Sequence, residues 1–401
     1  MQKTYSTAQP GMKAAIELSW QELDPITRNI GQLLSLFAPT VIPWALVEQL
    51  SAKSLQFNWI KTDLNWAKKQ LYQRQLIEQV EGREDCYQIP PLTRKFLQVK
   101  LAVSVQADDL RKTFAQTMVE IAYQIPDTPS PKIIESVKDA IPHLEEVAKT
   151  FTTALSNEDL LWLLDRLGRF YKTQELYAIA EPWFVQCLSV AQARLGNYHP
   201  DVATTLNNLA GFYYSQGRYT EAQALYKQAL VQRKHLLGDE HLDVATTLNN
   251  LAALYYSQGR YTEAQPLYEQ ALAQRKRLLG DEHLDVAATL NNLALLYYAQ
   301  GRYSKAQPLY QQALAQRKRL LGDEHPDVAT TLNNLAALYK CQRDYTKAIP
   351  LLLEALEINE RLLGVNHPNT VIFRKNLAIL MAKRSTSNFL WQRLFQFRKK
   401  I

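Results

Sequence analysis

Pairs of adjacent asparagines form the most regular chemical pattern in this 401-residue chain. They recur every 42 residues inside apolar segments, and a tyrosine follows each of the first three pairs about two helical turns later. The asparagines are Asn207, Asn208, Asn249, Asn250, Asn291, Asn292, Asn333 and Asn334, with a single Asn376 beyond them, and the tyrosines are Tyr214, Tyr256 and Tyr298. A carboxamide offers two N–H donors and an acceptor oxygen. A row of them can hydrogen-bond the main chain of an extended peptide whatever its side chains.

Two roles for the asparagines remain open. They can line a peptide-binding groove, with the tyrosines as flat apolar walls, or they can bond within the stack of repeats and fix its geometry. We expect the second role for one member of each pair. Asparagine is a poor residue in the middle of a helix, and nothing local requires it. We therefore predict that at least one asparagine of each pair faces a ligand.

Signatures of catalysis are missing from the sequence. It contains no G-x-x-x-x-G-K-[ST], G-x-S-x-G, C-x-x-C or H-E-x-x-H. One histidine recurs in each linker, at His199, His241, His283, His325 and His367. Equivalent histidines are separated by two helix layers of about 8–10 Å each, too far apart to share a metal ion. We expect each to make a loop hydrogen bond, and we predict a non-enzymatic protein without a cofactor or a metal.

Charge and cysteine content limit the classes of partner. The net charge is +7, with basic and acidic residues interspersed, which argues against nucleic acid as the partner. Basic runs such as Arg275-Lys276-Arg277 end the second helices, and we expect them to pair with linker acids rather than with phosphates. Three scattered cysteines fit a reducing compartment. The sequence shows no signal segment or transmembrane segment, which favours a cytoplasmic protein.

The elements that carry the asparagines are predicted helix pairs. In one copy, a first helix runs from about Asp243, its expected N-cap, to a stop at Gly259. A second helix opens with a capping-box spacing, Thr262 to Gln265. Two helices cannot bury their apolar faces alone, so the copies must stack. Alanines at the helix contacts permit close approach, namely Ala210, Ala252, Ala294 and Ala336 with Ala222, Ala264, Ala306 and Ala348.

The repeated text resembles a known family. The pattern L-x-x-L-A-x-x-Y followed by A-x-x-x-Y-x-x-A is similar to a tetratricopeptide repeat, and the LNNLA core with its LG-x-x-HPDVA linker resembles the kinesin light chain type. This resemblance implies a right-handed superhelix, an α-solenoid, whose concave groove binds partner or cargo peptides. We expect an array over 157–384, with units 157–198, 199–240, 241–282, 283–324 and 325–366 and a closing helix 367–384.

The N-terminal part has a different pattern. Helices followed by a hairpin, LIEQV-EGRED-CYQIP, resemble the winged-helix segment of the signal-transduction ATPases with numerous domains, without their nucleotide-binding module. We expect a disordered N-terminus (1–16), a winged-helix-like domain (17–105) and a helical connector (106–156). A basic aromatic tail (385–401) is expected to cap the last repeat.

The predicted function is that of an interaction scaffold or adaptor, similar to kinesin light chain. The groove takes a protein or peptide ligand, and the N-terminal domain contacts a second protein; a motor or a separate ATPase is among the partners considered. The alternative is a signalling or transcriptional regulator whose winged helix binds DNA through Lys68, Lys69 and Arg74, while the repeats sense a partner.

Overall fold

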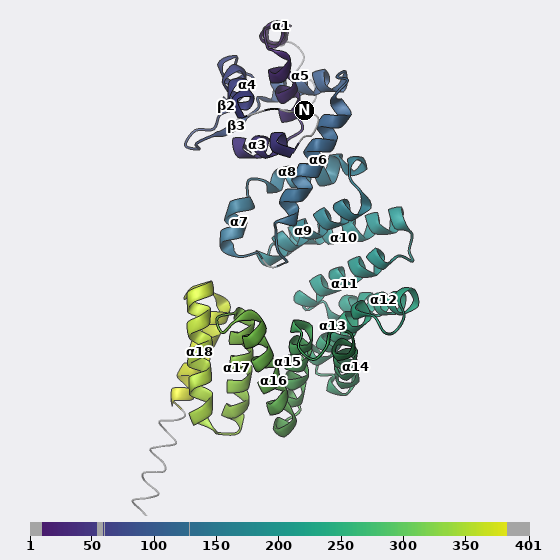
Figure 1. Cartoon of the computed structure of the whole chain (residues 1–401), viewed down its shortest axis with the longest axis vertical. Coiled ribbons are helices and arrows are strands. Elements are labelled where there is room, and N and C mark those ends of the chain that lie inside the picture. Colours follow the sequence, from purple (N-terminus) through teal and green to yellow (C-terminus); the bar gives the residue numbers. More distant parts are fainter. Residues whose placement is uncertain (1–9, 54–58, 60, 128, 383–401) are drawn as a thin grey trace, which may run out of the picture. The chain divides into compact units, whose positions relative to one another are not determined.

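The computed structural model describes residues 10–53, 59, 61–127 and 129–382 (Figure 1). The chain is mostly helical and divides into two compact units, with the boundary between Asn197 and Tyr198. Residues 1–9 of the expected disordered N-terminus and the whole predicted tail 385–401 lie outside the described residues.

The N-terminal unit begins with short helices around a small sheet. Its first elements are α1 (Pro10–Gln21), α2 (Pro25–Leu34), β1 (Ile42–Pro43), α3 (Trp44–Lys53), α4 (Lys61–Gln73), β2 (Glu78–Gln79), β3 (Cys86–Gln88) and α5 (Pro91–Ala102). The sheet has the antiparallel order β1-β3-β2. The predicted hairpin is therefore confirmed. Asp24 caps α2 by accepting from the Thr27 backbone N–H at 2.9 Å.

Helix α1 corrects the expectation of disorder up to residue 16. The segment folds because it has partners far along the chain. Trp20 is buried, and its ring packs edge-on against Phe96 with centroids 5.8 Å apart. Glu17 pairs with Lys100 at 2.8 Å. Neither contact is visible in the local composition on which the prediction of disorder rested.

The rest of the unit contains α6 (Ala107–Tyr123), α7 (Pro131–Val137), α8 (Ile141–Thr150), a 3₁₀ turn (Thr152–Ala154), α9 (Asn157–Thr173) and α10 (Tyr177–Leu195). The segment between the sheet and the repeats is packed against the first helices rather than extended from them. His143 on α8 is fully buried: its Nδ1 accepts from the Ala38 N–H at 3.1 Å, and its Nε2 lies 3.0 Å from the Val41 carbonyl oxygen. Burial lowers the pKa of His143 to about 4.

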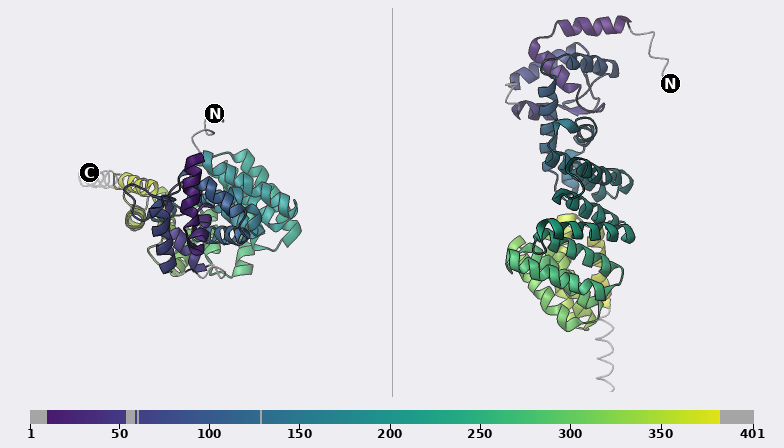
Figure 2. Two further views of the ribbon diagram at one scale, coloured as in Figure 1. Left: turned by 90° about the horizontal axis from the view of Figure 1, so that it is seen from above. Right: turned by 90° about the vertical axis from the view of Figure 1, so that its right-hand side faces the viewer.

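The second unit is an array of helix pairs, which can be followed by colour from teal to yellow in Figures 1 and 2. The pairs are α11 (Pro200–Ser215) with α12 (Tyr219–Leu237), α13 (Leu242–Ser257) with α14 (Tyr261–Leu279), α15 (Leu284–Ala299) with α16 (Tyr303–Leu321), and α17 (Pro326–Cys341) with α18 (Tyr345–Leu363). Residues 368–382 are also helical. The chain is thus the predicted solenoid-like array.

Packing inside the pairs follows the expected rule. The eight repeated alanines are all buried, which confirms that they lie where helices approach closely. Leucines and tyrosines of one pair, such as Leu293 and Tyr297, join a hydrophobic core that continues through successive pairs. Each junction reuses the same residue types. Each pair therefore buries its apolar face against the pairs next to it in the array.

The helix starts differ from the prediction. His241, not Asp243, caps the first helix, since its Nδ1 accepts from the Asp243 N–H at 3.1 Å. The other linker histidines do the same, which confirms the expected loop hydrogen bond. The second helix begins at Tyr261, before Thr262, so the expected capping box does not form. The predicted stop is present: Gly259 has a φ of 73°, which favours glycine.

Candidate peptide-binding face

The asparagines form a ladder of hydrogen bonds between successive first helices. At four successive junctions, the second asparagine of one unit donates from Nδ2 to Oδ1 of the first asparagine of the preceding unit. The pairs are Asn250 to Asn207 (3.2 Å), Asn292 to Asn249 (3.3 Å), Asn334 to Asn291 (3.2 Å) and Asn376 to Asn333 (3.2 Å). We call this set of side chains the asparagine ladder. Successive first helices α11, α13, α15 and α17 contact one another directly along it.

Both members of a pair, rather than one, bond within the stack. Asn249 takes part in a bond between units and in one within its own unit. Its Oδ1 accepts from Asn292, and its Nδ2 lies 3.5 Å from Oδ1 of Asn250. Each inter-unit bond uses one of a carboxamide's two N–H groups, or one of the two lone pairs of its oxygen. The ladder therefore fixes the register between units and keeps further hydrogen-bonding capacity.

Exposure differs along the ladder. Asn207 and Asn291 are buried, whereas Asn249, Asn250, Asn292, Asn333, Asn334 and Asn376 are half-buried. Asn208 is half-buried as well. The neighbouring Leu248 and Leu251 are buried against the helix stack. The half-buried carboxamides thus lie at the surface of the first-helix layer.

The tyrosines lie seven residues after the first asparagine of their pair, on the same side of the helix. Each ring packs against the tyrosine that opens the second helix. The ring centroids are 6.0 Å apart for Tyr214 and Tyr219, 5.7 Å for Tyr256 and Tyr261, and 5.8 Å for Tyr298 and Tyr303. All three predicted rings are half-buried and lie against the hydrophobic core. Burial raises the pKa of Tyr256, so its hydroxyl stays protonated.

Two of these tyrosines have a hydroxyl partner in the next unit. The Tyr214 hydroxyl lies 2.9 Å from Oγ of Ser257, and the Tyr298 hydroxyl lies 3.2 Å from Sγ of Cys341. In the last unit Lys340 stands at the tyrosine position, and with Asn333 and Asn376 it lines a small hollow of about 40 Å³. Sequence reasoning missed Lys340, although the alignment of the copies shows it.

The basic helix ends are mainly structural. Arg275 is buried, and its Nη1 donates to the Asp285 carbonyl oxygen at 3.1 Å and to Oγ1 of Thr289 at 2.7 Å. Arg233 and Arg317 make the same bonds at their own junctions. Lys276 pairs with the linker carboxylate of Asp281 at 2.9 Å. Pairing with linker acids, the predicted role of these residues, is therefore observed.

In the N-terminal unit, two of the three residues considered for DNA contact are paired within the chain. Lys68 forms an ion pair with Asp85 at 2.7 Å and lies over the ring of Trp44. Arg74 lies 3.6 Å from a carboxylate oxygen of Glu22. Lys69 is exposed on α4, the helix that also carries Lys68.

Within the described ranges, no cluster of three His, Cys, Asp or Glu residues could hold a metal ion. None of the helices in that part of the chain is both long and apolar enough to cross a membrane.

Comparison with known families gives the repeats a name. The tetratricopeptide repeat model matches overlapping segments 159–230, 201–277, 243–319, 285–361 and 327–385, which together span more than half of the chain. The chain belongs to the tetratricopeptide repeat family. No curated protein matches it.

Several solved structures are similar to this tetratricopeptide repeat protein. BtubC (BKLC) from P. vanneervenii is 29% identical with a TM-score of 0.47, and the match covers 59% of this chain and 92% of that one. The apo quorum sensor NprR from B. thuringiensis is 16% identical with a TM-score of 0.52, covering 74% and 75%. A signal-transduction ATPase with a tetratricopeptide repeat sensor from Pyrococcus horikoshii is 14% identical with a TM-score of 0.44, covering 96% and 66%.

Proposed function

We propose that this protein is a non-enzymatic interaction scaffold that binds an extended peptide segment of a partner along the asparagine ladder. One observation carries the proposal: the carboxamides make regular hydrogen bonds between units and keep further donors and acceptors for a ligand. Half-buried carboxamides such as Asn250 and Asn292 are held in a fixed register by their bonds to the preceding unit. Side chains that are already ordered lose little conformational freedom when they bind a ligand.

The chemistry of the ladder favours main-chain recognition. Carboxamides are neutral and offer both donors and acceptors, as peptide groups do. The aligned tyrosines Tyr214, Tyr256 and Tyr298 supply partly exposed apolar surface at the edge of the ladder. We therefore expect a ligand that needs an extended backbone and an occasional apolar side chain, rather than one with a strong charge.

The test is selection of peptides from a displayed random library with the full chain. Asn250→Ala with Asn292→Ala removes two ladder bonds at adjacent junctions. Thr247→Val with Thr289→Val is the control at the same junctions, because it removes the hydroxyls that accept from Arg233 and Arg275 and donate to the Asp243 and Asp285 carbonyl oxygens. Peptides selected by the wild type should bind the threonine variant and lose affinity for the asparagine variant. Equal binding by both variants would remove the ladder from the binding surface.

A contact between the N-terminal unit and a second protein is also part of this proposal. Support comes from the pairing of Lys68 with Asp85 and of Arg74 with Glu22, which leaves less positive charge for phosphates. The winged-helix likeness and any motor or ATPase partner stay predictions. Salt-dependent affinity of the full chain for duplex DNA would favour the alternative regulator.

A further inference from the structure

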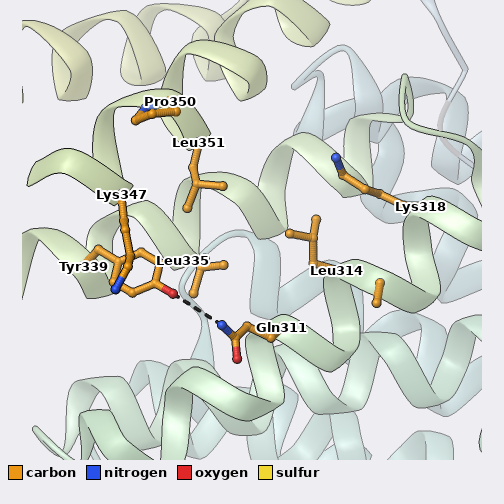
Figure 3. Close-up of a pocket in the computed structure, with 9 residues that line it drawn as sticks. Gln311, Leu314, Lys318, Leu335, Tyr339, Lys347, Pro350 and Leu351 are labelled. Atoms are coloured by element: carbon orange, nitrogen blue, oxygen red, sulfur yellow. Dashed lines mark hydrogen bonds between the residues drawn. The ribbon is translucent and has the colours of Figure 1, made fainter. Parts of the chain in front are cut away.

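The last helix pair carries a hollow next to Tyr339. Its volume is about 530 Å³, and it lies between α16, α17 and α18 (Figure 3). Leu314, Leu335, Pro350 and Leu351 give it apolar walls, and Gln311 donates to the Tyr339 hydroxyl at 3.3 Å. We call this site the Tyr339 hollow.

The three preceding pairs show what this tyrosine normally binds. In each, the arginine just before the second helix places its guanidinium over the equivalent ring. Arg218 lies 3.9 Å from the centroid of Tyr213, Arg260 lies 4.1 Å from that of Tyr255, and Arg302 lies 4.6 Å from that of Tyr297. A guanidinium over a tyrosine face is attracted by the ring's quadrupole. The same tyrosine environment thus holds an arginine three times in this chain.

The last pair has lost that arginine. Asp344 stands at the position of Arg302, and its carboxylate caps α18 instead. Two glutamines surround the guanidinium elsewhere: Arg302 donates to Oε1 of Gln265 at 3.0 Å and of Gln300 at 3.1 Å. In the last pair the equivalent glutamines lie next to each other, with Nε2 of Gln342 3.5 Å from Oε1 of Gln307.

Charge around the ring changes in the same direction. At Tyr297, Arg302 and Lys305 lie over the ring, and the hydroxyl donates to Glu269. At Tyr339, Lys347 alone lies over the ring and forms an ion pair with Asp344 at 2.9 Å, and the neutral Gln311 takes the place of Glu269 at the hydroxyl. Since Lys305 lies near Tyr297 together with Arg302, the equivalent Lys347 does not by itself exclude a guanidinium. The last site has therefore become more favourable for an added cation.

We propose that the Tyr339 hollow binds an arginine side chain presented by a partner protein. The guanidinium takes the place over Tyr339 that Arg302 takes over Tyr297. Its methylenes lie against the leucines of the hollow, and Asp344 supplies the opposite charge. The site is separate from the asparagine ladder, because Leu335 and Tyr339 point away from Asn333 on α17.

The experiment uses the full chain labelled with 3-fluorotyrosine and the probe N-acetyl-arginine amide. N-acetyl-citrulline amide, a neutral compound of nearly the same shape, is the control. The fluorine signal of Tyr339 is identified with Tyr339→Phe. We expect the arginine probe, at about 10 mM, to shift this signal in a saturable way and the citrulline probe to leave it unchanged. No saturable shift, or equal shifts with both probes, overturns the proposal.

Two substitutions test the origin of the site. Asp344→Arg restores the internal arginine and should weaken binding of the probe by about tenfold or more. Arg302→Asp should create a second site, so that the Tyr297 signal responds as well. Unchanged binding by Asp344→Arg contradicts the proposal even if Arg302→Asp does not fold. Asn250→Ala with Asn292→Ala should bind the probe normally, which separates this site from the proposed peptide face.

Discussion

The two units of the molecule bury polar groups in different ways. In the N-terminal unit, the neutral His143 bonds the loop at Ala38 and Val41, and Arg94 donates to the Phe37 carbonyl oxygen of the same loop. The array buries a charged arginine at its junctions and repeats the arrangement at Arg233, Arg275 and Arg317. A buried neutral histidine makes the stability of the N-terminal unit depend on pH, whereas a repeated arginine with several oxygen partners makes the stability of each junction depend on its own hydrogen bonds. The following predictions test this difference.

Loss of one junction arginine should have the largest effect. Arg275→Ala leaves the oxygen atoms of Asp285 and Thr289 without a charged donor, and we expect a loss of about 2–4 kcal/mol. Arg277→Ala is the control, because Arg277 is exposed and only forms a surface pair with Glu240. It should change stability by less than about 0.5 kcal/mol. Denaturant unfolding with hydrogen exchange in α13–α15 measures both; equal effects would refute a special role for burial.

Acidification should act on the N-terminal unit through His143. Above the unfolded pKa of 6.5 the histidine is neutral in both states. As the pH falls below 6.5, the unfolded chain takes up a proton that the folded unit does not accept until about pH 4. We therefore expect a loss of about 3 kcal/mol between these values.

The control for this pH effect is His143→Gln, which cannot titrate. It should lower stability at pH 7 and flatten the dependence between pH 4 and 6.5. Urea unfolding monitored by tryptophan fluorescence measures it, since the tryptophans in the described part of the chain belong to the N-terminal unit. A wild-type and a variant curve with the same slope would remove His143 as the cause.

A smaller loss is expected from the asparagine ladder. Asn250→Ala with Asn292→Ala removes the bonds to Asn207 and Asn249, and we expect a cost of about 1–3 kcal/mol. The variant should remain folded by circular dichroism. A larger cost would mean that the ladder acts mainly on stability, as the buried arginines do.

The smallest expected effect is an increase in stability. Arg343 has a φ of 63° at the helix stop where the three preceding pairs have glycine. Arg343→Gly should raise the stability of the last pair by about 0.5–1 kcal/mol, because glycine adopts this conformation without strain. The thermal unfolding midpoint is the measurement, with Gly301→Arg as the reverse exchange. A decrease on Arg343→Gly would show that the arginine side chain makes a contact that outweighs the strain.

Much of this fold could be predicted from the sequence, and the misses have physical causes. The 42-residue copies and their buried alanines predict the helix pairs, because apolar spacing alone requires stacking. The capping of α13 by His241 was missed, since two suitable acceptors stand two residues apart and only the backbone geometry selects one. Helix α1 was missed because Phe96 and Lys100, which hold it, are distant in the chain.

The candidate site was predicted only in part. Spacing identified the asparagines, but their partners lie 43 residues away, and no local rule relates Asn250 to Asn207. The exchange of Arg302 for Asp344 is visible in the sequence. Its consequence, a tyrosine ring with a lysine but no arginine over it, required knowledge that the arginine stacks on Tyr297.

The bonds of the ladder have a consequence for how such a chain can change over generations. Each joins a residue to another 43 positions earlier, and every junction repeats the same donor and acceptor. A duplication or deletion of one whole 42-residue copy would therefore create a junction with the same bonds as the old ones. Recombination between near-identical copies could alter the length of the array in single steps without passing through an unfolded protein.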